Sequence, residues 1–368
     1  MKKTPQTSTP VGTAPKNSEL FPVRRNVLGM VAHTIFFGLP VMLRAATQAT
    51  AATTGTEPVC ISAGEALARY GFADGHPLGS DRQAAFLNNA EKNLLLANVQ
   101  LCGLRQATIE ELGRFHTGDH IDRVQHAERD NLKFLDDGDT PVFPGVFEAA
   151  ATVVGSALEA LSNVMNGTCR RTFQPIGGLH HARRNHSAGF CVFNDLGVVI
   201  ETLRLQYGVR RIAYVDIDVH HGDGIFYSYE DDPDLIFADI HEDGQYLYPG
   251  TGNEQETGKG PAKGTKLNIA LKPGAGDAQF MAAWPRVEAH LTKYAPDFVL
   301  FQCGADGLKG DPLAHLNYSP AVHSTAARSL RRIADRFARG RWMAFGGGGY
   351  DRNNLAAAWT AVLQAMTD

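Results

Sequence analysis

The sequence predicts an α/β protein in which helices cover both faces of a single parallel sheet. From residue 57 onward, short apolar runs rich in Val, Ile and Phe alternate with longer helix-like stretches, a pattern typical of parallel strands buried on both faces. Most of these runs are followed by polar residues or glycines, and open α/β sheets bind their ligands beyond the carboxyl ends of the strands. The composition, 43% hydrophobic and 20% charged residues, is that of a globular protein.

The elements follow one another in regular alternation. The helix-like stretches are residues 80–100, 144–166, 195–207, 277–294, 319–339 and 353–366. The strand-like runs are residues 211–219, 235–240, 265–271, 298–303 and 342–345. Because there is no internal repeat and no second linker, residues 57–368 are expected to form one domain.

Charge and cysteine content narrow the classes of function. The net charge of −4 and the pI of about 6.4 argue against a broad nucleic-acid surface. The five cysteines are scattered and contain no CxxC pair, so we expect neither a disulfide framework nor a cysteine-based zinc site.

Residues 1–56 form a separate leader or tail. Arg24 and Arg25 precede an apolar run over residues 27–43, and an Ala-Thr-Ala triplet follows at residues 49–51. This order resembles a twin-arginine export leader. A retained tail or oligomerisation helix and a membrane anchor are the alternatives, with membrane contact confined to residues 24–44. The protein would be exported to the periplasm if residues 1–52 are cleaved, and cytoplasmic otherwise.

The densest group of ionisable residues runs from Asp216 to Asp223. If the strand at 211–219 continues through it, Asp216, Asp218 and His220 project to one face. A second loop, residues 304–312, offers Asp311. Two carboxylates and one imidazole suit zinc and leave a coordination position open, which is the arrangement of a catalytic rather than a structural zinc site.

Two further patterns lie outside this group. His180 and His181 are adjacent in a loop flanked by glycines, where they could approach a substrate. Four glycines at residues 346–349 precede Tyr350, whose hydroxyl could donate a hydrogen bond. The glycine run lacks the Lys and Ser/Thr spacing of a phosphate-binding P-loop.

In combination, the motifs resemble the zinc-dependent histone deacetylase family. His-His, D-x-D-x-H-H-G-D-G, P-G-T-G, G-A-D…G-D-P and G-G-G-G-Y occur in the order seen in that family. The family includes bacterial deacetylases and acetoin-utilisation proteins, and the resemblance covers residues 57–368. It implies the arginase/deacetylase fold, a parallel sheet of about eight strands with helices on both sides.

The resemblance also implies roles for individual residues. It assigns one zinc ion to Asp218, His220 and Asp311, and a potassium site to Asp216, Asp239 and Ile240. The expected catalytic residues are His180, His181, Tyr350, Asp216 and Asp223. The expected substrate-binding residues are Asp139 at the rim and Gly189, Phe190, Tyr248, Tyr318 and Gly348 along an acyl-lysine tunnel. Arg82 resembles the arginine of an internal channel.

This sequence departs from many relatives at three positions. Leu179 precedes the tandem histidines where relatives often have an aromatic residue or Gly. Asp239 stands where relatives often have Ser, which bears on the potassium site. Tyr318 falls where relatives often carry Leu or Met at the tunnel mouth, and there it would narrow the tunnel or add a polar contact.

The resemblance therefore implies hydrolysis of an N-acyl-lysine amide in proteins or peptides. His181, held by Asp223, would be the general base, and Tyr350 would help to stabilise the oxyanion. Acetylpolyamines and other small amides are alternative substrates, although no insertion that narrows the entrance is evident. A two-metal ureohydrolase on the same fold and an inactive acyl-binding protein are the competing classes. The sequence leaves the oligomeric state open.

Overall fold

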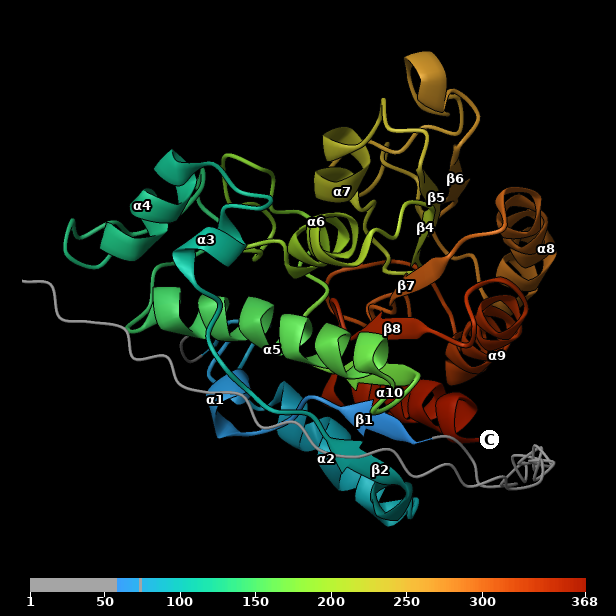
Figure 1. The fold of residues 1–368 in the computed structure, drawn as a ribbon, viewed down its shortest axis with the longest axis horizontal. Helices are drawn as coiled ribbons and strands as arrows, with labels where there is room; N and C mark the ends of the chain where they lie inside the picture. The colour runs from blue at the N-terminus through green and yellow to red at the C-terminus, as the bar shows by residue number, and fades with distance from the viewer. Residues whose placement is uncertain (1–57, 73–74) are drawn as a thin grey trace, which may run out of the picture. The chain divides into compact units, whose positions relative to one another are not determined.

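A computed structural model describes residues 58–72 and 75–368. Eight strands form one sheet in the order β2-β1-β3-β8-β7-β4-β5-β6 (Figure 1). All neighbouring strands are parallel. The strands are β1 (Val59–Ile61), β2 (Val99–Leu101), β3 (Arg171–Gln174), β4 (Ile212–Asp216), β5 (Leu235–Glu242), β6 (Lys266–Leu271), β7 (Phe298–Gln302) and β8 (Trp342–Phe345). The expected parallel sheet of about eight strands is confirmed.

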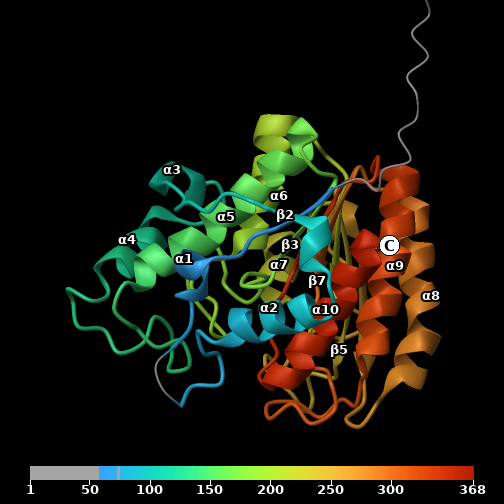
Figure 2. The same ribbon diagram turned by 90° about the horizontal axis from the view of Figure 1, so that it is seen from below.

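Helices cover both faces of the sheet (Figure 2). One face carries α1 (Glu65–Ala68), α3 (Ile109–Leu112), α4 (Gly118–His126), α5 (Val146–Asn166), α6 (Asp195–Tyr207) and α7 (Asp223–Ser228). The other carries α2 (Arg82–Lys92), α8 (Asp277–Tyr294), α9 (Pro320–Phe337) and α10 (Arg352–Thr367). Two short 3₁₀ helices, η1 (Leu96–Asn98) and η2 (Gly260–Ala262), complete the described elements.

The central strands are apolar because they are covered on both sides. Every residue of β4, β5 and β7 is buried, and their side chains divide between two hydrophobic cores, one under each layer of helices. Continuous apolar runs of this kind are typical of a parallel sheet whose two faces are both shielded from water. The backbone hydrogen bonds of these strands are made to their neighbours in the sheet.

The polar strand ends converge at one place. Asp216 at the end of β4 pairs in register with Asp239 on β5 and with Gln302 on β7. The loops that follow β4, β7 and β8 therefore begin side by side at the carboxyl edge of the sheet. This is the edge at which α/β proteins place their ligands.

The elements expected from the sequence differ from the structure in three main places. The strand expected over residues 211–219 ends at Asp216, so Asp218 and His220 lie in the loop that follows it. The strands β1, β2 and β3 were not predicted, because β1 and β2 have only three residues each and β3, Arg-Thr-Phe-Gln, is not an apolar run. The helix expected over residues 80–100 ends at Lys92, since Leu94 has a left-handed φ of 58° that a helix cannot continue through. The chain then forms η1 and β2.

The leader or tail predicted for residues 1–56 lies outside the described residues. Among the helices of residues 58–72 and 75–368, none is long and apolar enough to cross a membrane.

Candidate metal centre and catalytic residues

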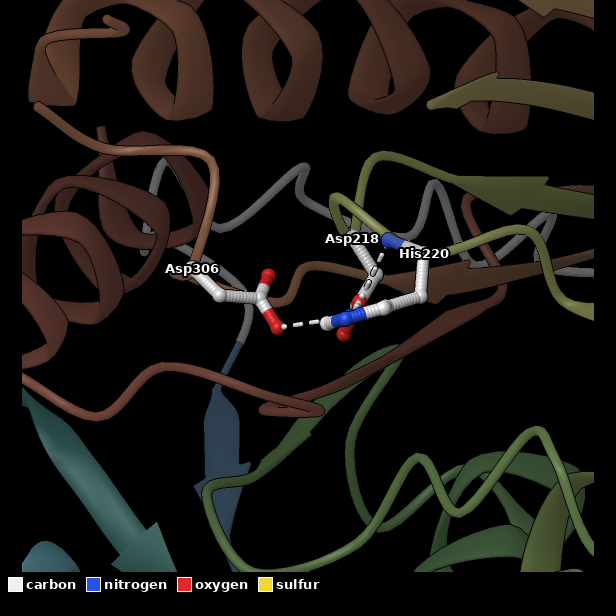
Figure 3. A group of neighbouring side chains, drawn as sticks. All are labelled: Asp218, His220 and Asp306. Atoms are coloured by element: carbon white, nitrogen blue, oxygen red, sulfur yellow. Dashed lines mark hydrogen bonds and ion pairs between the residues drawn. The ribbon is translucent and has the colours of Figure 1, made fainter. Parts of the chain in front are cut away.

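Three buried side chains form a group that could bind a metal ion: Asp218, His220 and Asp306 (Figure 3). Asp218 and His220 lie in the loop after β4, and Asp306 lies in the loop after β7. The His220 Nδ1 atom is 3.2 Å from Asp218 Oδ1 and 3.3 Å from Asp306 Oδ2. An imidazole between two carboxylates is a donor set that suits zinc.

The prediction of Asp311 as the third member of this group is wrong. The Asp311 carboxylate instead accepts the backbone N–H groups of Tyr350, at 2.8 Å, and Leu313, at 3.0 Å. Asp306 lies four residues beyond the end of β7, close to the sheet edge, whereas Asp311 lies farther along the same loop. Proximity to the strand end decides which aspartate reaches Asp218 and His220.

The electrostatics of the group favour a bound cation. Burial alone would lower the pKa of the His220 imidazole, but the Asp218 and Asp306 carboxylates outweigh burial and raise this pKa to about 10. Burial and the Asp218 charge raise the pKa of Asp306 to about 6. Asp306 Oδ2 is buried, and among the described residues it makes no hydrogen bond besides its ion-pair contact with His220. A cation would satisfy this oxygen and balance the two carboxylates.

Neighbouring groups orient the carboxylates. Asp218 Oδ2 accepts hydrogen bonds from Gln302 Nε2 and from the backbone N–H of Gly348, both at 2.8 Å. The backbone N–H of Val219 donates to Asp306 Oδ1 at 3.0 Å. A side chain at Gly348 would overlap the Asp306 carboxylate, so this glycine permits the close approach of the loop after β8. Gln302 was not singled out from the sequence, because a glutamine in an apolar strand gives no metal signal.

The tandem histidines are each held by a carboxylate. His180 Nδ1 is 2.8 Å from Asp216 Oδ2, and His181 Nδ1 is 2.7 Å from Asp223 Oδ1. Asp216 also accepts a short hydrogen bond from the Tyr214 hydroxyl. The two histidine Nε2 atoms are 3.1 Å apart. The structure thus brings His180 together with Asp216, and His181 together with Asp223.

His181 has the protonation state that a general base needs. Burial and the neighbouring His180 lower the pKa of His181 to about 4, in spite of the opposing effect of Asp223. The imidazole is therefore neutral at pH 7. With its Nδ1 proton directed to Asp223, the lone pair lies on Nε2, the atom that faces away from the carboxylate.

A narrow tunnel leads to this group from the surface. Its inner end is a cavity of about 20 Å³ lined by both histidines, Asp218, His220, Gly348 and Tyr350, among others. Its mouth is a cavity of about 250 Å³ lined by Asp139, His181, Gly189, Phe190, His220, Leu247, Tyr248, Leu313 and Tyr350. The Phe190 ring lies edge-on to Tyr350, and the Tyr248 ring lies edge-on to His181. A slender apolar chain with a polar end fits this shape.

Tyr350 lies at both ends of the tunnel, where its hydroxyl can act as a hydrogen-bond donor. Burial and the charges of Asp306 and Asp218 raise its pKa well above the usual tyrosine value, so the hydroxyl keeps its proton. Arg82 supports the glycine run before Tyr350: it donates to the carbonyls of Gly347, at 2.6 Å, and Gly349, at 3.0 Å. The guanidinium of Arg82 also lies 5.9 Å from the centre of the Tyr350 ring.

The prediction that Tyr318 lies at the tunnel mouth is wrong. Tyr318 is only 2% exposed, and its ring lies edge-on to Phe280 of α8 in the core. Leu313 occupies the mouth in its place. The turn at residues 311–313 carries Leu313 toward the tunnel, whereas Tyr318 immediately precedes the capping residue of α9 and packs inward.

Asp139 lies at the rim, as expected. It lines the tunnel mouth and also an adjoining groove of about 850 Å³. Asp136 is held beside it by accepting the backbone N–H groups of residues 138–140 at distances of 2.9–3.1 Å. Burial and the neighbouring Asp136 raise the pKa of Asp139 to about 7.

The residues predicted for potassium also lie close together. Asp216 and Asp239 are partners on adjacent strands, and Ile240 follows Asp239 on β5. Both oxygens of Asp239 already accept hydrogen bonds: Oδ1 from His241 Nδ1 at 2.7 Å, and Oδ2 from the backbone N–H of Gly222 at 2.8 Å. Potassium binding there stays a prediction.

The fold and the site together define a class of protein. A doubly covered parallel sheet, with a buried group of metal-binding type and a His–Asp pair at the end of a tunnel, is a framework that suits a metal-dependent hydrolase. The histone deacetylase domain family matches residues 76–366. The solved structure of the HDA15 HD domain has a TM-score of 0.76 at 25% identity, and the match covers 84% of this chain and 89% of that chain.

Curated relatives agree with these matches. The chain is 36% identical to acetoin utilization protein AcuC of Bacillus subtilis over 81% of this chain and 79% of that protein. It is 31% identical to histone deacetylase RPD3 of Saccharomyces cerevisiae over 80% of this chain and 68% of that protein. The chain therefore belongs to the histone deacetylase family, whose members are hydrolases that act on amide bonds.

Proposed function

We propose that the chain hydrolyses the amide bond of N-acyl lysine, above all N-acetyl-lysine, in proteins or peptides, and releases a carboxylate and the free amine. The observation that carries this proposal is the position of Asp218, His220 and Asp306 at the end of a narrow tunnel beside Tyr350 and His181. The tunnel admits an extended side chain and places its terminal amide next to acid–base groups.

One zinc ion fits the group formed by Asp218, His220 and Asp306. The buried Asp306 Oδ2 and the two carboxylates around one imidazole support this assignment. When bound, zinc would supply a Lewis acid and lower the pKa of water. A potassium ion at Asp216, Asp239 and Ile240 would be a second cofactor.

Side chains of the protein carry out the proton transfers and stabilise the developing charge. His181 Nε2, neutral and oriented by Asp223, accepts the proton of the attacking water and later returns it to the leaving amine. The Tyr350 hydroxyl donates to the carbonyl oxygen as negative charge develops on it. Phe190 and Tyr248 flank the acyl-lysine chain, and the Asp139 carboxylate accepts backbone N–H groups of the substrate at the rim.

The first experiment measures amine release from a fluorogenic acetyl-lysine peptide by the purified full chain. We expect turnover that is lost with a chelator, restored by one equivalent of zinc and blocked by a hydroxamate. The His181→Ala variant should be inactive while still binding zinc. Turnover that survives complete metal removal would refute the zinc-dependent mechanism.

A small acylated polyamine is a second candidate substrate. Asp136, Asp137 and Asp139 line the groove beside the mouth, and their carboxylates could attract a polycation. Parallel assays of an acetyl-lysine peptide and an acetylpolyamine decide between the two substrates. A higher kcat/KM for the polyamine, abolished by neutralising these carboxylates, would favour the small amine.

A further inference from the structure

Arg183 lies directly behind the His181–Asp223 pair. Its Nη2 atom donates to Asp223 Oδ2 at 2.6 Å, while Asp223 Oδ1 accepts from His181 Nδ1 at 2.7 Å. The two oxygens of one carboxylate are thus held by two different partners. Asp223 is 4% exposed, so an unpartnered oxygen there would be costly.

The guanidinium of Arg183 is itself held in place. Its central carbon lies 4.8 Å from the centre of the Tyr227 ring, and the Tyr227 hydroxyl donates to Glu256 at 2.8 Å. Tyr227 and Asp223 both belong to α7. One short helix therefore presents both the carboxylate and the aromatic face that Arg183 contacts, which fixes the direction of its hydrogen bond.

We propose that Arg183 is a positioning residue for the deacylase reaction: by occupying Asp223 Oδ2, it fixes the carboxylate so that Oδ1 holds His181 in its reactive orientation. This inference rests on the proposed function. Without Arg183, the carboxylate would be free to rotate about its last bond and to draw a water molecule to Oδ2. The His181 ring would then lose its fixed tautomer and its alignment with the substrate.

A role in substrate contact is the competing explanation. Arg183 is 30% exposed at its side chain and lines the groove that shares Asp139 and Tyr248 with the tunnel mouth. A residue that binds substrate equally in the ground and transition states changes KM, whereas one that aligns the general base changes kcat. The two roles are therefore separable by kinetics.

The test compares Arg183→Ala with Arg184→Ala in the full-length enzyme loaded with zinc. We expect kcat of Arg183→Ala on the acetyl-lysine peptide to fall by about 10–100-fold, with KM changed by less than about twofold. Arg184 carries the same charge but pairs with Glu201 at 2.8 Å. Its variant should keep kcat near that of the parent, and Arg183→Lys should lose less than Arg183→Ala.

Chemical rescue separates positioning from general destabilisation. The groove of about 850 Å³ beside Arg183 is wide enough for small ions, so millimolar guanidinium should restore part of the kcat of Arg183→Ala. Urea, which has a similar shape and no charge, should not. Equal zinc content and melting temperature in all variants exclude a folding defect as the cause.

The outcomes are distinct. An unchanged kcat in Arg183→Ala, or a rise in KM alone, would overturn the positioning role while leaving the proposed function intact. A loss of kcat that neither Lys nor guanidinium restores would also overturn it. Absence of turnover in the parent protein on every acyl substrate would instead remove the proposed function on which the inference rests.

Discussion

The backbone N–H of Tyr350 donates to Asp311 Oδ2 at 2.8 Å. This hydrogen bond joins the loop after β7 to the glycine-rich loop after β8, and it holds the start of the segment that carries the Tyr350 hydroxyl. Asp311 thus supports the tyrosine, whereas Asp306, in the same loop, faces His220.

Because the two aspartates contact different groups, we expect their alanine variants to lose different properties. Asp306→Ala should abolish stoichiometric zinc binding, because it removes one of the three proposed ligands. Asp311→Ala should keep one zinc per chain but lower kcat by about 10–100-fold, because Tyr350 loses its backbone anchor. Metal analysis after dialysis, combined with turnover, measures both effects. Loss of zinc from Asp311→Ala with retention in Asp306→Ala would reverse the assignment.

Removal of the Tyr350 hydroxyl should affect chemistry and leave metal binding intact. Loss of one donor to a developing oxyanion typically lowers the rate by about 10²–10³-fold, and we expect Tyr350→Phe to fall in this range. The variant keeps the ring that packs edge-on to Phe190, so the tunnel wall should persist. Binding of a hydroxamate to the variant, measured by calorimetry, serves as the control that the metal site is intact. Full activity in Tyr350→Phe would exclude the hydroxyl from the reaction.

Leu313 and Tyr318 should differ in their influence on substrate choice. Leu313→Ala widens the tunnel mouth, so we expect its relative kcat/KM for longer acyl chains or bulkier peptides to change. Tyr318→Phe removes a buried hydroxyl that has no hydrogen-bond partner among the residues that the structure describes. The activity and melting temperature of this variant should stay near those of the parent. A change of substrate preference in Tyr318→Phe, with none in Leu313→Ala, would contradict the structure of the mouth.

The sequence was sufficient to predict a parallel sheet with its central strands and to single out Asp218 and His220, and the reasons are local. The strand runs at β4, β5 and β7 are apolar throughout because they are covered on both faces, and this is visible as composition. Asp218 and His220 occur in one short motif, where spacing along the chain reflects spacing in the structure. The pairs His180–Asp216 and His181–Asp223 each join two separate motifs, and only the resemblance to a known family predicted them. The three-residue strands β1 and β2 offer too few positions for such a pattern.

The incorrect predictions concern residues in a loop, where the loop conformation determines which side chain faces inward. Asp306 and Asp311 are both acidic residues of one glycine-containing loop, and composition cannot tell which of them reaches His220. Composition likewise cannot tell whether Leu313 or Tyr318, farther along that loop, lines the tunnel mouth. Gln302, and the Arg183–Asp223 pair, depend on contacts between separate segments, so no spacing within the sequence reveals them.

The rim carboxylates predict a pH dependence of substrate binding. Burial and the neighbouring Asp136 raise the pKa of Asp139 to about 7, so this carboxyl gains a proton as the pH falls through neutrality. If only the ionised form accepts the backbone N–H groups of the substrate, KM should rise about tenfold between pH 8 and pH 6, with kcat changing less.

In Asp136→Asn the neighbouring charge is gone, so the pKa of Asp139 should fall and the rise in KM should move to lower pH. Asp137→Asn, in the same groove, is the matched control and should keep the parent profile. A KM that is flat over this range in the parent would show that Asp139 does not titrate there or does not bind the substrate.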